Sequence, residues 1–246
     1  MKRFLSLFLV FALLMGFAPS VHADAAVKLS KTKLTLEVGK SSTLKIAGTI
    51  KTVTWASSKK EVATVSKGKV TAKSVGTANI TATVSGKKYT CKITVEPKKY
   101  TEGQYKVGKD IKEGEYIVFA NKDTSGYFEL ANDANGDDII TNDNFDYNTI
   151  IQINDGEYIK LSRAYAVSIE YVSKLDLKGE GMFKVGTYIN SGEYKLEADK
   201  DSSGYYCIYS DNRHDDIVTN DNFKGSVYVT VENGQYLKLS RCKIIE

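Results

Sequence analysis

A 60-residue stretch of this chain is present twice, and the duplication constrains the fold more than any other feature. When residues 105–164 are paired with residues 183–242, a shift of 78 positions, 28 of the 60 positions are identical without a gap. Of these identities, 17 lie in three blocks, which in the first copy hold Val107-Gly108, Ile111, Gly114-Glu115-Tyr116, then Thr141 to Phe145, then Gly156, Tyr158 and Lys160 to Arg163. Such a match indicates a duplicated structural unit.

The composition favours β-structure. Hydrophobic residues make up 42% of the chain and charged residues 26%, as in ordinary globular proteins, so each part of the chain can bury a core. Tyrosine supplies 16 of the 26 aromatic residues, and the chain has only 2 prolines. Tyrosine packs well on a half-buried pleated surface. With 246 residues, the chain is long enough for more than one such domain.

The charge is unevenly distributed between two parts of the chain. Residues 24–100 carry 16 Lys and 4 acidic residues, a net charge of +12, whereas residues 101–246 carry 16 basic and 26 acidic residues, a net charge of −10. Each part could attract opposite charge, or the other part, in a salt-dependent way. Solvated charged strand faces are the alternative. Nucleic acid is a poor partner for residues 24–100, which contain no arginine for bidentate base contacts.

The first 23 residues are predicted to be a signal peptide. Lys2-Arg3 forms a basic start, residues 4–17 are apolar, and Val21-His22-Ala23 is a small-residue cleavage motif, so the mature chain is expected to begin at Asp24. The apolar run is too short to span a bilayer comfortably, which favours export over membrane insertion. Without a lipidation or sorting motif, we expect a secreted protein that is released or held non-covalently at the cell wall.

Residues 24–96 are predicted to form one β-sandwich. Apolar and polar residues alternate in short runs such as Leu34 to Val38, and Gly39 breaks that run. The sequence of residues 53–65, followed by 68–73 and 76–82, closely resembles the group 2 bacterial immunoglobulin-like domain. The resemblance implies a sandwich of about seven strands, a fold common in extracellular and adhesive proteins, where it often serves as a spacer.

Two residues of this module raise the question of a site. Trp55 invites a ligand-binding interpretation, but its place in the strand pattern and the family's core position favour packing inside the sandwich. Cys91 shares a predicted face with Tyr89, Ile93 and Val95. We therefore expect it to be a small buried hydrophobic residue rather than a disulfide partner.

The rest of the chain divides into two repeats and two junctions. We expect a linker at residues 97–104, which hold the mature chain's only proline, a first repeat at 105–171, a second linker at 172–182 and a second repeat at 183–246. Alternating strands and turns predict six to eight strands per repeat, in a small sandwich or partly open barrel. Asp155-Gly156 and Asn233-Gly234 predict type I′ hairpins. The repeats resemble an uncharacterised repeat of secreted Gram-positive proteins, which implies no activity.

An acidic loop in the first repeat raises the possibility of calcium. Asp133, Asn135 and Asp137 alternate as in a calcium-binding loop. The second repeat has Arg213 at the position of Asn135, and a cation there would repel calcium. A solvated turn held by side-chain to backbone hydrogen bonds is favoured, so we predict no metal and no cofactor.

The repeated Asn-Asp-Asn-Phe segments are the candidate ligand site. Polar groups that can bind hydroxyls lie near an aromatic platform and an arginine, a combination suited to sugar recognition. The candidates are Tyr127, Asn142, Asp143, Asn144 and Arg163 in the first repeat, and Tyr205, Asn220, Asp221, Asn222 and Arg241 in the second. The alternative is that the Asx side chains cap a turn while Phe145 enters the core.

Two cysteines occur only in the second repeat. Cys207 and Cys242 stand where the first repeat has Glu129 and Ala164. Because both changed together in a predicted exported chain, they are candidates for a disulfide, and strand alternation predicts that both are exposed. Free thiols remain the alternative, because sequence does not determine cysteine geometry.

These observations favour a non-enzymatic binding or adhesion protein. The mature chain has a single histidine, His214, which argues against a histidine-dependent triad. We expect the tandem repeats to recognise a glycan, a wall polymer or an extracellular protein, with avidity from two linked copies. The alternatives are a purely structural component of the cell surface and an extracellular polysaccharide hydrolase.

Overall fold

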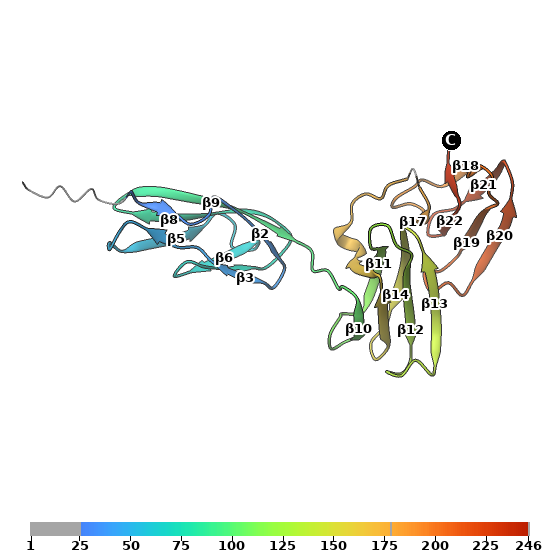
Figure 1. The fold of residues 1–246 in the computed structure, drawn as a ribbon, viewed down its shortest axis with the longest axis horizontal. Coiled ribbons are helices and arrows are strands. Elements are labelled where there is room, and N and C mark those ends of the chain that lie inside the picture. The colour runs from blue at the N-terminus through green and yellow to red at the C-terminus, as the bar shows by residue number, and fades with distance from the viewer. Residues whose placement is uncertain (1–25, 178, 246) are drawn as a thin grey trace, which may run out of the picture.

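The computed structural model describes residues 26–177 and 179–245 and consists almost entirely of β-strands (Figure 1). The predicted signal peptide and its cleavage site lie outside these residues. No helix in the described ranges is long and apolar enough to cross a membrane. The predicted all-β class is confirmed: three units follow one another along the chain, and each is built from two packed sheets rather than a closed barrel.

The first unit contains nine strands. They are β1 (Lys28–Leu29), β2 (Lys33–Glu37), β3 (Ser41–Thr43), β4 (Ile46–Ala47), β5 (Val53–Ser57), β6 (Ala63–Ser66), β7 (Lys69–Ala72), β8 (Gly76–Val84) and β9 (Lys87–Glu96). The sheet β2-β9-β8-β5 faces the sheet β3-β7-β6, and β1 pairs with β4. The strand β2 runs parallel to β9, while the other pairs are antiparallel.

The core of this unit holds both residues that raised a question. Trp55 is half-buried and packs against the apolar cluster between the sheets, as predicted. Cys91 is fully buried in the same cluster. Burial raises the pKa of its thiol, so the side chain behaves as a small inert hydrophobic group.

The two repeats share one topology of seven strands each. The first contains β10 (Gly103–Lys106), β11 (Gly114–Ala120), β12 (Gly126–Ala131), β13 (Ile139–Phe145), β14 (Asn148–Ile153), β15 (Tyr158–Ser162), β16 (Ala164–Ser168) and a short 3-10 turn η1 (Ile169–Tyr171). The second contains β17 (Gly181–Lys184), β18 (Gly192–Ala198), β19 (Gly204–Tyr209), β20 (Ile217–Phe223), β21 (Ser226–Val231), β22 (Tyr236–Ser240) and β23 (Cys242–Ile244). Sheets β10-β15-β12-β13 and β14-β11-β16 match sheets β17-β22-β19-β20 and β21-β18-β23.

The predicted type I′ hairpins at Asp155-Gly156 and Asn233-Gly234 are wrong. The turn at Gly156 joins β14 in the three-stranded sheet to β15 in the four-stranded sheet, so the chain crosses between sheets there. Gly156 has a positive φ of 90° but Asp155 does not, whereas a type I′ turn needs both. Paired positive φ values occur instead in the first unit at Lys67-Gly68 and Ser85-Gly86, which close true hairpins.

Both junctions are shorter than the composition indicates. Tyr100 lies inside the predicted first linker but is buried in the core of the first repeat, where its backbone exchanges hydrogen bonds of 3.0 and 2.8 Å with Ala166 on β16. Met182, assigned to the second linker, lies on β17 and is fully buried. Sequence composition did not predict these two buried positions, because each is a single apolar side chain in a segment that otherwise has the composition of a loop.

The two repeats pack against each other through different faces, side by side in Figure 1. The outer face of the three-stranded sheet of the first repeat meets the outer face of the four-stranded sheet of the second. The buried residues of this contact are Ile117, Ile150, Met182, Cys207, Tyr209 and Tyr236. Because the two faces differ, the contact is a head-to-tail one rather than a symmetric one.

A carboxylate is held at the centre of this contact. Glu115 of β11 accepts hydrogen bonds from three groups of the second repeat: Lys184 Nζ at 2.6 Å, Tyr236 OH at 2.6 Å and Asn212 Nδ2 at 2.9 Å. Burial, and then the bond to Glu115, raises the pKa of Tyr236, which therefore keeps its proton to donate. Charge-assisted bonds of this kind are stronger than neutral ones.

A loop of the second repeat covers the open edge of β14. Asn212 O accepts from Gln152 N at 3.0 Å, Arg213 NH2 lies 3.0 Å from Glu157 Oε1, and His214 Nε2 lies 2.9 Å from Ile150 O. These contacts satisfy edge groups that would otherwise face water or another strand.

His214 also reaches the sandwich interior of the first repeat. Its ring stacks on Tyr209 at 5.2 Å and meets the edge of Phe128 at 5.6 Å. Burial lowers the pKa of His214, partly offset by its hydrogen bond to the Ile150 carbonyl and by Asp143.

We expect Glu115→Ala to lower the free energy of unfolding of the repeats by about 2–4 kcal/mol, because Lys184 and Tyr236 would lose their hydrogen-bond acceptor. Glu193 is the equivalent residue of the second repeat and is exposed, so Glu193→Ala is a matched control expected to change stability by less than about 0.5 kcal/mol. Urea unfolding followed by circular dichroism measures both. Fluorescence of Trp55, the chain's only tryptophan, reports the first unit and should stay constant. Equal effects of the two variants would contradict this role of Glu115.

We expect acid to weaken the contact between the repeats through His214. The folded pKa lies below the ordinary value near 6.5, so the stabilisation is complete above that pH and declines as the pH falls below it, when the unfolded chain binds the proton first. Urea midpoints measured from pH 8 down to pH 5 for the native chain and for His214→Gln would test this. The variant should show a shallower decline below about pH 6.5, and identical slopes would contradict the assignment.

Candidate functional site

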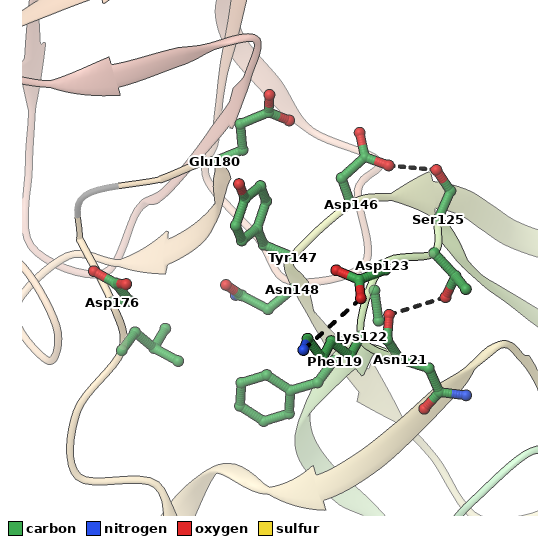
Figure 2. Close-up of a pocket in the computed structure, with 13 residues that line it drawn as sticks. Phe119, Asn121, Lys122, Asp123, Ser125, Asp146, Tyr147, Asn148, Asp176 and Glu180 are labelled. Carbon is green, nitrogen blue, oxygen red and sulfur yellow. Dashed lines mark hydrogen bonds and ion pairs between the residues drawn. The ribbon is translucent and has the colours of Figure 1, made fainter.

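A groove lies beside the junction of the repeats, at the end of the first repeat's three-stranded sheet (Figure 2). Its volume is about 560 Å³. Three segments form it: the loop after β11, the turn between β13 and β14, and the connection between the repeats. The lining residues are Phe119, Ala120, Asn121, Lys122, Asp123, Thr124, Ser125, Asp146, Tyr147, Asn148, Leu175, Asp176 and Glu180.

Backbone hydrogen bonds fix the walls of the groove. Asn121 N donates to Arg163 O at 2.8 Å, and Ala120 N donates to Tyr147 O at 2.9 Å. Asp123 has a positive φ of 61°, which lets the loop close on itself within four residues. These bonds connect the loop after β11 to the facing turn and to the end of β15.

Aromatic rings provide the apolar surface. Tyr147 is 55% exposed, and one edge of its ring lies against the backbone of Gly179. Phe119 stacks on Tyr165 with ring centroids 5.3 Å apart and planes at 22°, so its ring is held in place. Figure 2 shows the rings of Phe119 and Tyr147 on either side of Asn148.

Carboxylates provide most of the charged groups of the groove. Asp123, Asp146, Asp176 and Glu180 line the groove, against one cation, Lys122. Lys122 Nζ lies 3.9 Å from Asp123 in a fully solvated pair, which contributes little. Ser125 Oγ donates to Asp146.

Two further polar groups have fixed roles. Burial raises the pKa of Glu180, opposed by a backbone hydrogen bond at Arg241. Asn148 is buried and donates to Met182 O at 2.8 Å, which ties the turn to the second repeat. The groove therefore depends on the packing of the repeats.

This arrangement can bind hydroxyl or ammonium groups beside an apolar ring. The thirteen lining residues include no His or Cys that would act as a nucleophile or a strong metal ligand. Within residues 26–177 and 179–245, no group of three or more His, Cys, Asp or Glu side chains is placed to hold a metal ion.

The groove is not duplicated. The second repeat has Glu197 at the position of Phe119, and Gly225 at the position of Tyr147. Both aromatic rings are therefore confined to the first repeat.

The Asn-Asp-Asn segments lie in strands rather than in turns. Asn142, Asp143 and Asn144 belong to β13, and Asn220, Asp221 and Asn222 belong to β20. Asn142 and Asn144 are exposed on the outer face of the four-stranded sheet, beside Glu129 and Tyr127 of β12. Tyr127 OH donates to Glu129 at 2.9 Å. Asp143 instead forms a part-buried ion pair across the junction, with Lys238 Nζ at 2.6 and 2.7 Å.

Tyr127 pairs with Asn144 in the first repeat and Tyr205 with Asn222 in the second, and some of the predicted residues also come together across the two repeats. A smaller cavity of about 160 Å³ at the junction is lined by Asn144 of the first repeat together with Tyr205 and Arg241 of the second. This cavity shares Asp146, Asn148 and Glu180 with the groove, so the two spaces are adjacent. Asn220, Asp221 and Asn222 lie elsewhere and are exposed.

The two arginines have a structural role that the sequence analysis missed. Arg163 and Arg241 have positive φ values of 51° and 53°, at the point where the chain passes from one sheet to the other. Each Nε donates at 2.8 Å to a loop carbonyl, Ser125 O for Arg163 and Ser203 O for Arg241. The bond from Arg163 supports the wall of the groove, which contains Ser125.

The acidic loop is held by hydrogen bonds from its own backbone. Asp133 accepts from the N–H groups of Asn135 at 2.7 Å, Asp137 at 3.3 Å and Asp138 at 2.7 Å, and these bonds, that of Asp138 foremost, lower its pKa. Asp211 makes the same set of bonds in the second repeat. Both carboxylates thus stabilise the turn.

The disulfide prediction is corrected by the structure. Cys207 and Cys242 are both free and both buried. Cys207 lies on β19 of the four-stranded sheet and faces the first repeat, whereas Cys242 lies on β23 of the other sheet and faces the core. The expectation of exposure fails because alternation locates a face of a sheet but does not reveal what covers that face.

The groove residues Phe119, Tyr147, Asp176 and Glu180 were not among the predicted site residues. The segment that carries Asp176 and Glu180 lies between the repeats and has no repeated sequence to draw attention to it. The available signal was a difference between copies: Asp146-Tyr147 is replaced by Lys224-Gly225 in the second repeat.

Comparison with known proteins identifies the first unit. Residues 25–95 match the family model of the bacterial Ig-like domain (group 2), which confirms the resemblance seen in the sequence. No curated protein matches the chain. Among solved structures, SGBP-B of the Bacteroides ovatus mixed-linkage glucan utilization locus, in complex with mixed-linkage heptasaccharide, is 11% identical over 56% of this chain, with a TM-score of 0.17. The match spans 50% of that protein, and a score this low carries no argument about this chain.

We expect all three thiols to resist alkylation in the folded protein. Burial raises the pKa of Cys242 to about 11 and also raises that of Cys91, so little thiolate, the reactive form, is available. Mass spectrometry after iodoacetamide treatment should show no adduct on the native chain and three adducts after denaturation without a reductant. Only one adduct after denaturation would indicate that Cys207 and Cys242 are bonded after all.

Proposed function

We propose that this protein is a secreted, non-enzymatic binding protein of the cell surface, and that its paired repeats recognise a glycan or wall polymer through the groove. The observation that carries the proposal is the exposed ring of Tyr147 beside fixed carboxylate and amide groups. A sugar ring stacks its apolar face on an aromatic side chain while its hydroxyls bond to such planar polar groups.

The charge of the groove narrows the ligand class. Four carboxylates and one lysine repel polyanions and favour neutral sugars or sugars with a free amino group. The carboxylate of Glu180 lines the groove and can accept hydrogen bonds from hydroxyl or ammonium groups of a ligand. We therefore favour a neutral or amino-containing glycan over an anionic wall polymer.

The first unit fits the role of a spacer in this proposal. Its two packed sheets form a compact sandwich, and its lysine-rich strands provide a charged surface. Export through the predicted signal peptide and a Gram-positive source, implied by the resemblance of the repeats, belong to the same proposal. A hydrolase remains the alternative if bound polysaccharide is cleaved.

The test is binding of the chain without its predicted signal peptide to soluble oligosaccharides, measured by calorimetry. The panel contains neutral hexose oligomers, N-acetylated and free amino sugar oligomers, and an anionic polysaccharide. We expect Tyr147→Ala to weaken binding at least about tenfold, because stacking on the ring is lost. Tyr228 is 57% exposed and lies outside the groove, so Tyr228→Ala is the matched control and should bind normally.

Three results would change the conclusion. Binding of no member of the panel would favour a purely structural role. Equal losses for Tyr147→Ala and Tyr228→Ala would move the site away from the groove. Release of reducing sugar during incubation would support the hydrolase alternative.

A further inference from the structure

Each repeat has two docking faces, and the contact inside the chain uses only one face of each repeat. The first repeat uses its three-stranded sheet and the second uses its four-stranded sheet. The outer face of β10, β15 and β12 lies outside this contact, and we call it the front face. It carries the exposed Gln104, Lys106 and Lys160, together with the half-buried Tyr158 and Glu129, whose side chain is 12% exposed. The uncovered outer side of β18, β21 and the β20 edge, the rear face, carries Glu193, Lys195, Asp221 and Tyr228.

The central contact of the internal junction has a complete counterpart on these free faces. Glu115 and its donors Lys184 and Tyr236 correspond, with the 78-residue shift, to Glu193 on the rear face and to Lys106 and Tyr158 on the front face. The residue type is identical at all three pairs of positions, although Glu193 does not contact Lys106 or Tyr158 within the chain.

The front face is already arranged to receive this carboxylate. Lys106 Nζ lies 5.3 Å from the ring centroid of Tyr158, and Lys184 Nζ lies 5.5 Å from that of Tyr236. The free pair thus has the geometry of the pair that binds Glu115. A preformed receptor lowers the ordering cost of binding.

The second ion pair of the junction is also kept. Asp143 binds Lys238 within the chain, and the corresponding residues are Asp221 on the rear face and Lys160 on the front face. Asp221 is exposed, and Lys160 makes only a loose 3.9 Å contact with Glu129. Both are available to a partner.

The apolar centre of the junction is replaced by opposite charges. Ile117 and Cys207, which are buried together in the internal contact, become Lys195 on the rear face and Glu129 on the front face. Two exposed apolar faces would aggregate, whereas a lysine and a glutamate keep each free face soluble and still complement each other.

We propose that copies of this chain associate head to tail, with the rear face of one copy docked on the front face of the next as the repeats dock within the chain. Asn212 and His214 correspond to Ala134 and Gly136, so the side-chain hydrogen bonds that Asn212 and His214 make in the internal contact have no counterpart. Association between copies is consequently weaker than the internal contact, reversible and sensitive to salt. Because the contact is heterologous, it generates a chain or ring of copies.

Charge reversal with mixing tests this geometry by sedimentation velocity at low ionic strength over increasing protein concentration. The native chain is expected to associate. Glu193→Lys and Lys106→Glu should each raise the dissociation constant at least about tenfold, because like charges then meet at the central contact. An equimolar mixture of the two variants should recover association, since every rear face then finds a front face of opposite charge.

The controls reverse the same charges away from both faces. Glu61→Lys and Lys60→Glu lie at exposed positions of the first unit and should associate as the native chain does. Circular dichroism checks that all variants are folded. A native chain that stays monomeric at every concentration, or single variants that associate as strongly as the native chain, would overturn the proposal. Recovery missing from the mixture would overturn the head-to-tail arrangement.

Discussion

The arrangement of the repeats depends on one part-buried carboxylate. Glu115 binds an ammonium, a phenol and an amide of the second repeat, and these three donors lie on β17, β22 and the loop before β20. A charge at this depth is tolerated only with its partners in place, so the contact requires one relative orientation of the two sandwiches. The apolar residues around Glu115 contribute most of the buried surface of the contact. The hydrogen bonds of its carboxylate determine how the two sandwiches are aligned.

The groove follows from that orientation. One wall belongs to the first repeat, another to the connection, and Asn148 fixes the turn by bonding to the backbone of the second repeat. Two identical units, each folded alone, would present neither this groove nor the smaller cavity beside it. The site therefore arises from the packing of unlike faces, and the two copies differ in sequence at its aromatic rings, Phe119 and Tyr147.

Much of the architecture could be predicted from the sequence. Alternation located most strands, the repeat located two equivalent units, and the motifs around Trp55 identified the first sandwich because its core positions follow a regular pattern. The chain path between sheets could not be predicted: Asp155-Gly156 suits a hairpin, yet only long-range packing decides which sheet the next strand joins. The candidate site was found in part, since Asn144, Tyr205 and Arg241 do converge, but on a junction between copies that no local pattern describes.

The early burial of Tyr100 has a mechanical consequence. Only residues 97–99 separate the last strand of the first unit from this anchor, and three residues span at most about 10 Å. Pro97 further restricts the backbone of this segment. The connection is too short to act as a tether that lets the repeats search a wide volume. It acts as a short joint, so a force applied at the groove passes through the backbone pair of Tyr100 and Ala166 directly into the first sandwich.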